Sequence, residues 1–166
     1  MPRKYALVPR HPLVLISPRI EDHESLRSIL RDSPWELRGT VTGRAGLEMI
    51  RRNPAGFPVL ICEQSIPDGG WRLLLAELGK LEVRPILIVS SRLADERLWA
   101  EVLNLGAFDL LLGAPFDAEE VLRVAQGAWW AWDRAFGPSS VSRIGPGLSR
   151  SLDDTPAKAL AVGAYI

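Results

Sequence analysis

Short runs of consecutive apolar residues, spread along the chain, constrain its fold more than any other feature of the sequence. The runs cover residues 13–17, 58–62, 85–90 and 108–112. Each is too short for a typical helix and has no polar face, which is typical of a strand in a parallel sheet covered by helices on both sides. Residues 35–41 (WELRGTV) alternate in polarity and predict a half-exposed fifth strand.

The segments between these runs have apolar residues at helical spacing. They predict helices after Asp22 and over residues 43–52, 71–80 and 94–105, followed by a long closing helix over 117–136. Asp22 and Asp117 stand where two of these helices begin, so we expect both to be N-caps.

Five strand–helix units in succession predict an α/β fold. Their number and length are typical of the flavodoxin-like, doubly wound, five-stranded parallel sheet of order 2-1-3-4-5 with five helices. In that topology ligands bind beyond the carboxyl ends of strands 1 and 3. We therefore expect the functional residues to follow Ile16 and Cys62.

Composition separates the predicted domain from its two ends. Residues 1–11 form a basic arm, residues 12–136 carry the domain, and residues 137–166 are rich in Gly, Pro and Ser and predict a disordered tail. With 20 basic against 20 acidic residues, the chain has no basic excess of the kind that binds nucleic acid. A single cysteine, no signal peptide and no membrane span indicate a cytoplasmic protein.

Several motifs in this order resemble the receiver domain of bacterial two-component response regulators. They are ICEQSIPDGGW, ILIVSS and LGAFDLLLGAPFD, followed by the closing helix, and the resemblance covers residues 12–136. It implies a CheY-like fold and a role in phosphorelay signal transduction. In that family an aspartate that ends strand 3 is phosphorylated, two acidic residues after strand 1 help it to bind Mg²⁺, and a lysine precedes a proline after strand 5.

The resemblance assigns family positions to individual residues of this chain. Glu63 takes the phosphoacceptor position, four residues before Pro67, and Ser90 takes the position of the switch hydroxyl. Ala114 replaces the lysine, and Pro115 corresponds to the family's cis-proline.

The acidic pair allows two alignments. Either Ser17 and Pro18 replace it, or Glu21 and Asp22 supply it a few residues later and could bind a metal together with Glu63. Phosphoryl transfer depends on cations that neutralise the developing charge, so the missing lysine and the longer Glu63 argue against phosphorylation. We therefore expect no cofactor, with Mg²⁺ only if the site works. Glu63 instead either pulls permanently on Ser90 or is a solvated relic of the site.

The closing helices contain more large apolar residues than one core can bury. Trp99 and Leu103 lie on a flank of the 94–105 helix, whose core face is Ala94, Leu98, Val102 and Leu105. Trp129, Trp130 and Trp132 cannot all point inward, since adjacent helix positions diverge by about 100°. We expect a protein interface that includes Trp99, Leu103, Trp129 and Trp130, unless the tail folds back over the tryptophans.

The expected protein is a stand-alone pseudo-receiver, not an enzyme, that binds a histidine kinase, a regulator, an output protein or a second copy of itself. Two alternatives stay open: a working Mg²⁺-dependent receiver that uses Glu21 and Asp22, and a small enzyme on a flavodoxin-like fold. His23 is expected at the surface, and Cys62 as a buried, inert thiol.

Overall fold

The structure, a computed structural model, describes residues 10–141. Its five parallel strands are β1 (His11–Ile16), β2 (Trp35–Thr40), β3 (Val59–Glu63), β4 (Ile86–Ser91) and β5 (Asp109–Leu112). They form one sheet of order β2-β1-β3-β4-β5, which confirms the predicted fold class.

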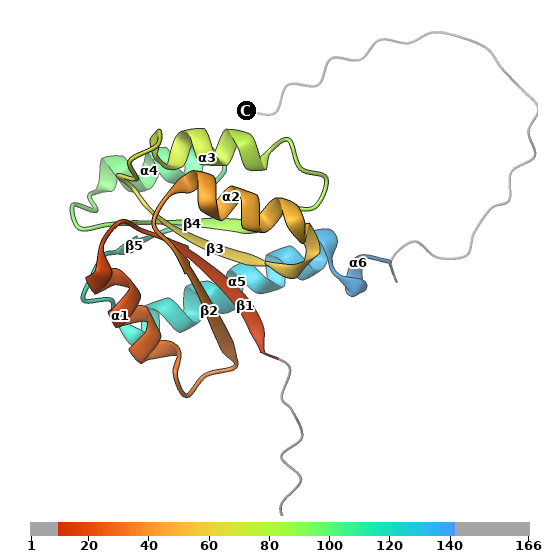
Figure 1. Cartoon of the computed structure of the whole chain (residues 1–166), viewed down its shortest axis with the longest axis horizontal. Coiled ribbons are helices and arrows are strands. Elements are labelled where there is room, and N and C mark those ends of the chain that lie inside the picture. The colour runs from red at the N-terminus through yellow and green to blue at the C-terminus, as the bar shows by residue number, and fades with distance from the viewer. Residues whose placement is uncertain (1–9, 142–166) are drawn as a thin grey trace, which may run out of the picture.

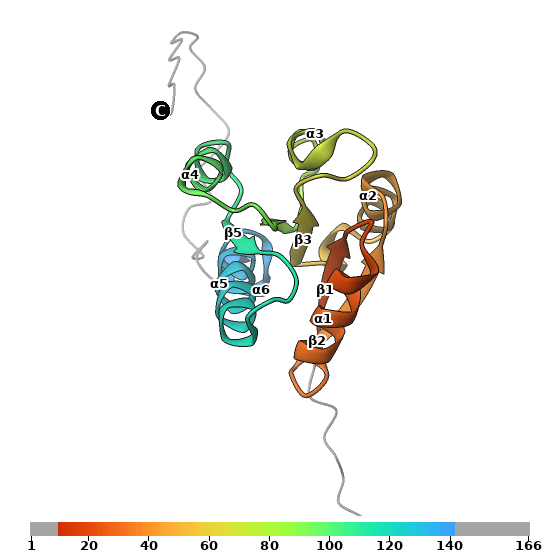
Figure 2. The ribbon, with the colours of Figure 1, turned by 90° about the vertical axis from the view of Figure 1, so that its left-hand side faces the viewer.

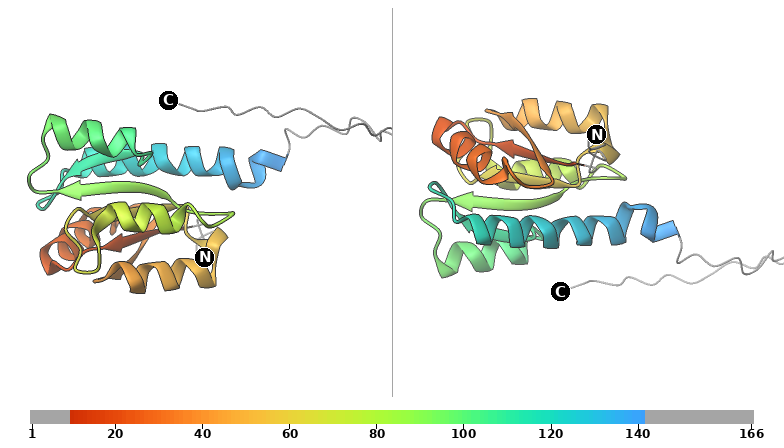
Figure 3. Two further views of the ribbon diagram at one scale, coloured as in Figure 1. Left: turned by 90° about the horizontal axis from the view of Figure 1, so that it is seen from above. Right: turned by 90° about the horizontal axis from the view of Figure 1, so that it is seen from below.

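Helices connect the strands and extend the chain beyond β5. They are α1 (Ile20–Leu30), α2 (Gly43–Arg52), the short 3₁₀ helix η1 (Pro54–Gly56), α3 (Gly70–Leu78), α4 (Glu96–Asn104), α5 (Ala118–Phe136) and α6 (Pro138–Val141). Figure 1 shows α2, α3 and α4 on one side of the sheet, and α1 and α5 on the other. The helix α6 continues from the end of α5, as the two views of Figure 3 show.

The core consists of two apolar layers, one on each face of the sheet. Alternate strand residues feed them: Val14 and Ile16 pack toward α2, α3 and α4, whereas Leu13 and Leu15 pack toward α1 and α5. This is why β1, β3 and β4 are apolar on both faces, whereas β2 is partly exposed.

Side-chain caps fix the start of three helices. Asp117 accepts a hydrogen bond from the Glu120 amide at 2.8 Å, which confirms it as the N-cap of α5. Asp95 and Thr42 cap α4 and α2 in the same way. By contrast, α3 follows Gly69, whose φ of 113° lies in the left-handed region that favours glycine.

The prediction that Asp22 caps α1 is wrong. Helix α1 begins three residues earlier than predicted, at Ile20, and its N-cap residue Arg19 makes no side-chain cap hydrogen bond. Asp22 therefore lies inside the first turn, where it is 2% exposed.

Two predicted boundary regions also differ in detail. The strand β1 starts at His11, inside the predicted arm, and α6 forms within the first residues of the predicted tail. The rest of the arm and of the tail, residues 1–9 and 142–166, lie outside the described residues. Between residues 10 and 141, no helix is both long and apolar enough to cross a membrane.

Candidate functional site

The carboxyl ends of β1, β3 and β4 bring the predicted site residues to one edge of the sheet. Ser17 follows β1, Glu63 ends β3, and Ser90 lies directly opposite Glu63 in the β3–β4 register. All three are buried. The register alone accounts for the pairing of Glu63 with Ser90, because parallel neighbours in register point to the same face of a sheet.

A buried network joins the end of β1 to the loop after β4. The Ser17 hydroxyl donates a hydrogen bond to Asp22 Oδ2 at 2.5 Å. The guanidinium of Arg92 lies 3.4 Å from Asp22 Oδ1, with the arginine side chain 34% exposed and the aspartate side chain 2% exposed. Asp22 is thus neutralised by an arginine of the chain itself.

The network involves both alternatives for the segment after β1. Ser17 occupies the strand end, and Asp22 turns back toward it from α1. Glu21, its neighbour, instead faces a surface cavity. Asp22 and Glu21 therefore have different surroundings, since one lies in the buried network and the other lines the cavity.

His23 is buried, which contradicts the predicted surface position. Its Nε2 lies 2.8 Å from the Ser17 carbonyl oxygen, so this ring nitrogen donates the hydrogen bond. The ring also lies over β2, where a Cβ on Gly39 would come within 2.5 Å of His23 Nδ1. Gly39 is therefore needed for this close approach of α1 to the sheet.

The Glu63 carboxylate is held by its own loop. Its Oε2 accepts a hydrogen bond from the Ser65 amide at 2.5 Å. The Ser90 hydroxyl is buried and has no hydrogen-bond partner among the described residues. The Ser90 hydroxyl therefore makes no hydrogen bond with Glu63, so the expected direct contact between them is absent from the structure. The alternative, a solvated Glu63, does not describe the structure either, because Glu63 is 6% exposed.

A second hydrogen-bonded group ties the loop after β3 to the loop after β4. The Ser91 hydroxyl donates to Gln64 Oε1 at 2.7 Å and accepts from the Leu93 amide at 3.1 Å. These contacts anchor the segment from Ser91 to Leu93 that leads into α4. Arg92 lies in the middle of this segment, so its guanidinium is held near Asp22.

The position of the family's lysine opens onto a cavity. Ala114 and Arg92 both line this space of about 620 Å³, which lies between α1 and the loop after β5. The Ala114–Pro115 peptide bond is cis. The loop is attached to α1 by a hydrogen bond from the Phe116 amide to the Ser25 hydroxyl at 3.1 Å.

The residues at this edge do not fit a magnesium ion. Among residues 10–141, no three His, Cys, Asp or Glu side chains lie close enough together to hold a metal. The best candidate ligand, Asp22, already has a hydroxyl and a guanidinium as partners. Mg²⁺ requires near-octahedral oxygen coordination, which an arginine beside the carboxylate opposes.

Cys62 is buried in β3, next to Glu63. Burial raises the pKa of the Cys62 thiol, and the negative charges of Glu63 and Asp68 raise it further. Because only the thiolate is an effective nucleophile, the raised pKa predicts low reactivity for this thiol in the folded protein.

The helices at the β5 edge carry exposed apolar side chains. Trp99 is 50% exposed, Leu103 36% and Trp130 58%. Figure 2 shows α4 and α5 on either side of β5. Trp129 does not join this face, because it packs on the α1/α5 core layer with its ring 4.7 Å from that of His11.

The core face predicted for α4 is correct at Leu98 and Val102, which are buried, but wrong at Leu105, which is 50% exposed. Leu105 is the C-cap residue of α4, just beyond the last helical turn. It therefore adds to the exposed apolar surface near β5.

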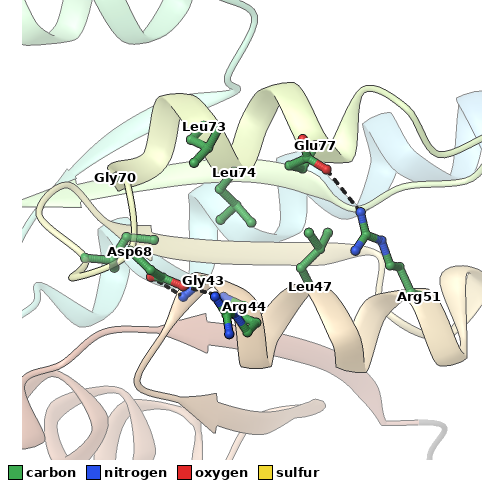
Figure 4. A pocket seen from close by; sticks show the side chains of 10 residues that line it. Gly43, Arg44, Leu47, Arg51, Asp68, Gly70, Leu73, Leu74 and Glu77 are labelled. Atoms are coloured by element: carbon green, nitrogen blue, oxygen red, sulfur yellow. Dashed lines mark hydrogen bonds and ion pairs between the residues drawn. The ribbon is translucent and has the colours of Figure 1, made fainter.

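A further groove lies between α2 and α3 (Figure 4). Leu47, Leu73 and Leu74 line it, and the Arg51–Glu77 ion pair closes one end. At the other end the Asp68 carboxylate accepts hydrogen bonds from the amides of Gly43 and Arg44 at 2.8 and 2.7 Å.

These amides control the ionisation of Asp68. Partial burial raises the pKa of this carboxyl, but the hydrogen bonds from the Arg44 and Gly43 amides outweigh burial and hold the pKa below its usual value. Asp68 therefore acts as a second cap of α2.

Sequence reasoning missed Arg92 and Asp68. A basic residue two positions after Ser90 was the available signal for Arg92, since the carboxyl end of β4 lies beside those of β3 and β5. No local signal identified Asp68, because the helix that it caps lies about 25 residues earlier in the chain.

Comparisons with known proteins agree with this architecture. No protein-family model matches the sequence, and none of the characterised proteins matches it either. The structure is similar to the signal receiver domain of an HD domain-containing protein from Pseudomonas fluorescens Pf-5, with a TM-score of 0.67 and 19% identity over 82% of this chain and 95% of that chain.

Two further solved structures are similar in the same way. A response regulator receiver domain protein from Clostridium thermocellum has a TM-score of 0.64 and 18% identity over 72% of this chain and 94% of that chain. A chain of the CheX-CheY-BeF3-Mg+2 complex from Borrelia burgdorferi has a TM-score of 0.63 and 15% identity over 71% of this chain and 88% of that chain. At these identities the similarity shows the CheY-like, flavodoxin-like fold.

Proposed function

We propose that the chain is a receiver-like domain of a two-component signalling pathway in the bacterial cytoplasm, that it is not phosphorylated, and that it acts by binding another protein. The observation that carries this proposal is the contact of Arg92 with the buried Asp22. It supplies a permanent positive charge at the edge of the sheet where a receiver would bind its metal ion.

The charges at the site oppose phosphoryl transfer. The incoming phosphoryl group brings negative charge, which a transferring site must neutralise with cations. Here Ala114 offers no charge, and Arg92 already has Asp22 as its partner. Glu63 is in addition longer than aspartate by a methylene and is fixed by the Ser65 amide, and a displacement of about 1 Å can cost roughly 100-fold in rate.

The buried network of Ser17, Asp22 and Arg92 takes the role that phosphorylation has in phosphorylated receiver domains. It connects β1 and α1 to the loop that enters α4, so the position of α4 depends on contacts made by the chain alone. We infer that the protein stays in one signalling state.

The face used for binding is the one formed by α4, β5 and α5. Trp99, Leu103 and Trp130 supply large exposed apolar side chains there, and buried aromatic anchors dominate the binding energy of most protein interfaces. The similar structure from Borrelia burgdorferi is itself a chain of a complex of CheX and CheY. The partner is a histidine kinase, another regulator, an output protein or a second copy of this chain.

A comparison of exposed apolar residues inside and outside the face formed by α4, β5 and α5 tests the binding proposal. Proteins that co-purify with the wild-type chain should be lost with Trp99→Ala and Trp130→Ala. Leu73→Ala is the matched control, because Leu73 is 52% exposed on α3, away from β5. Unchanged partners in both tryptophan variants, or equal loss in the control, would contradict the proposed face.

A further inference from the structure

A cavity beside the C-terminal half of α5 suggests what controls access to the face formed by α4, β5 and α5. Phe108, just before β5, and Trp130, on α5, line a space of about 460 Å³ together with Gly127, Asp133 and Arg134. Gly127 lets the Phe108 ring pack close to α5, because a Cβ at this position would come within 3.3 Å of that ring. We refer to these five residues as the Trp130 cavity.

The chain leaves the described structure close to this cavity. Trp130 lies six residues before the end of α5 at Phe136, which is about 9 Å along a helix. The α6 helix follows directly and ends at Val141. Any segment attached there therefore starts near the Trp130 cavity.

The sequence after Val141 ends in an apolar run. Residues 159–166 read ALAVGAYI and carry no charged side chain, whereas residues 142–158 are mostly polar or small. Seventeen residues separate Val141 from this run, and a flexible chain of that length has a mean span of about 21–25 Å, which is enough to reach the cavity. The cavity is lined by one acidic and one basic side chain, Asp133 and Arg134, so its formal charge is zero, which favours an uncharged occupant.

We propose that residues 159–166 bind in the Trp130 cavity of the same chain and cover part of the α4–β5–α5 face. The inference rests on the proposed function in that it names what regulates the same face. A short flexible tether gives an effective concentration on the order of 1 mM. A contact with a Kd of about 0.1 mM would then be formed in roughly nine chains out of ten. A partner that binds the face more tightly could still displace residues 159–166.

Acrylamide quenching of tryptophan fluorescence tests this contact directly, since all six tryptophans lie between residues 35 and 132. We compare the 166-residue chain with residues 1–141 and with the triple variant Leu160→Ser, Val162→Ser and Ile166→Ser. The expected result is stronger quenching in both altered chains. Leu148→Ser, in the linker, is the matched control and should behave like the wild type.

Four further outcomes test the proposal and separate the possible occupants. Trp130→Phe should remove most of the quenching difference between the long and the short chain. Equal quenching in all chains overturns the proposal, as does a difference that grows with protein concentration, which would assign the cavity to a second copy. A difference that follows deletion of residues 1–9 rather than the triple variant overturns it as well, because the N-terminal arm would then be the occupant.

The experiment also separates this inference from the proposed function. Quenching reports the tail contact without any partner. If the tail variants alter quenching but the tryptophan variants leave partner binding unchanged, the proposed function fails and the tail contact stands. If partner binding depends on Trp99 and Trp130 while quenching never changes, the tail contact fails and the proposed function stands.

Discussion

Replacement of Arg92 by methionine removes the positive charge beside Asp22 and keeps most of the side-chain volume. At an N–O distance of 3.4 Å, two unit charges attract each other by about 5 kcal/mol at an effective dielectric constant of roughly 20. Desolvation of Asp22 and ordering of the arginine oppose most of this attraction. Exposed pairs contribute about 0.2–1 kcal/mol, and breaking a fully buried pair costs about 3–5 kcal/mol.

The pair of Arg92 and Asp22 is intermediate, because the aspartate is buried and the arginine is one-third exposed. We therefore expect Arg92→Met to lower the free energy of unfolding by about 2 kcal/mol, which corresponds to a fall in Tm of roughly 4–8 °C for a domain of this size. Urea unfolding, monitored by tryptophan fluorescence, measures the change.

A double-mutant cycle with Asp22→Asn assigns the loss to the pair. In the Asp22→Asn background, Arg92→Met should cost little, giving a coupling energy of at least about 1 kcal/mol. Arg97→Met on α4 is the matched control, because Arg97 is exposed and has no ion-pair partner among residues 10–141. A coupling energy below about 0.3 kcal/mol would refute the idea that Arg92 neutralises Asp22.

Three further predictions concern other parts of the fold. Asp68→Ala should destabilise the protein by about 1 kcal/mol at neutral pH through loss of the α2 cap. Because the folded-state pKa of Asp68 is lowered, this contribution is complete above the unfolded-state pKa of about 3.9 and disappears as the pH falls through the folded-state pKa. The difference between the two proteins in urea titrations should therefore shrink as the pH falls below about 3.9, and a constant difference would contradict the cap. Burial raises the pKa of the Cys62 thiol, so a thiol reagent at pH 8 should modify it only after unfolding, and rapid modification of the native protein would show that the thiol is accessible. Trp132, 8% exposed, should cost about 3–5 kcal/mol when replaced by alanine, and Trp130, 58% exposed, less than about 1 kcal/mol; equal losses would place Trp130 in the core.

The sequence predicted the architecture because the core positions follow simple rules. Strands buried on both faces must be apolar throughout, and the runs around Ile61 and Ile88 satisfy this condition. Caps formed within one helix turn, such as Asp117, were also predictable. The start of α1 was not, because Asp22 has cap-forming chemistry but binds Ser17 and Arg92 instead.

The candidate site was predictable in position and only partly in its contacts. Strand register places Glu63 beside Ser90, as the spacing of the motifs implied. The partners of these side chains depend on loop geometry: Glu63 accepts from the Ser65 amide, and Arg92 reaches Asp22 across 70 positions of sequence. Neither contact leaves a periodic or local signal in the sequence.

Intact-mass spectrometry after incubation with acetyl phosphate and Mg²⁺ tests the central claim most directly. A phosphorylatable receiver domain treated in parallel is the positive control. Because Arg92 is paired with Asp22 and Ala114 provides no positive charge, the protein should keep its unmodified mass under conditions that modify the control. A stable increase by one phosphoryl group that disappears in Glu63→Gln would contradict the account.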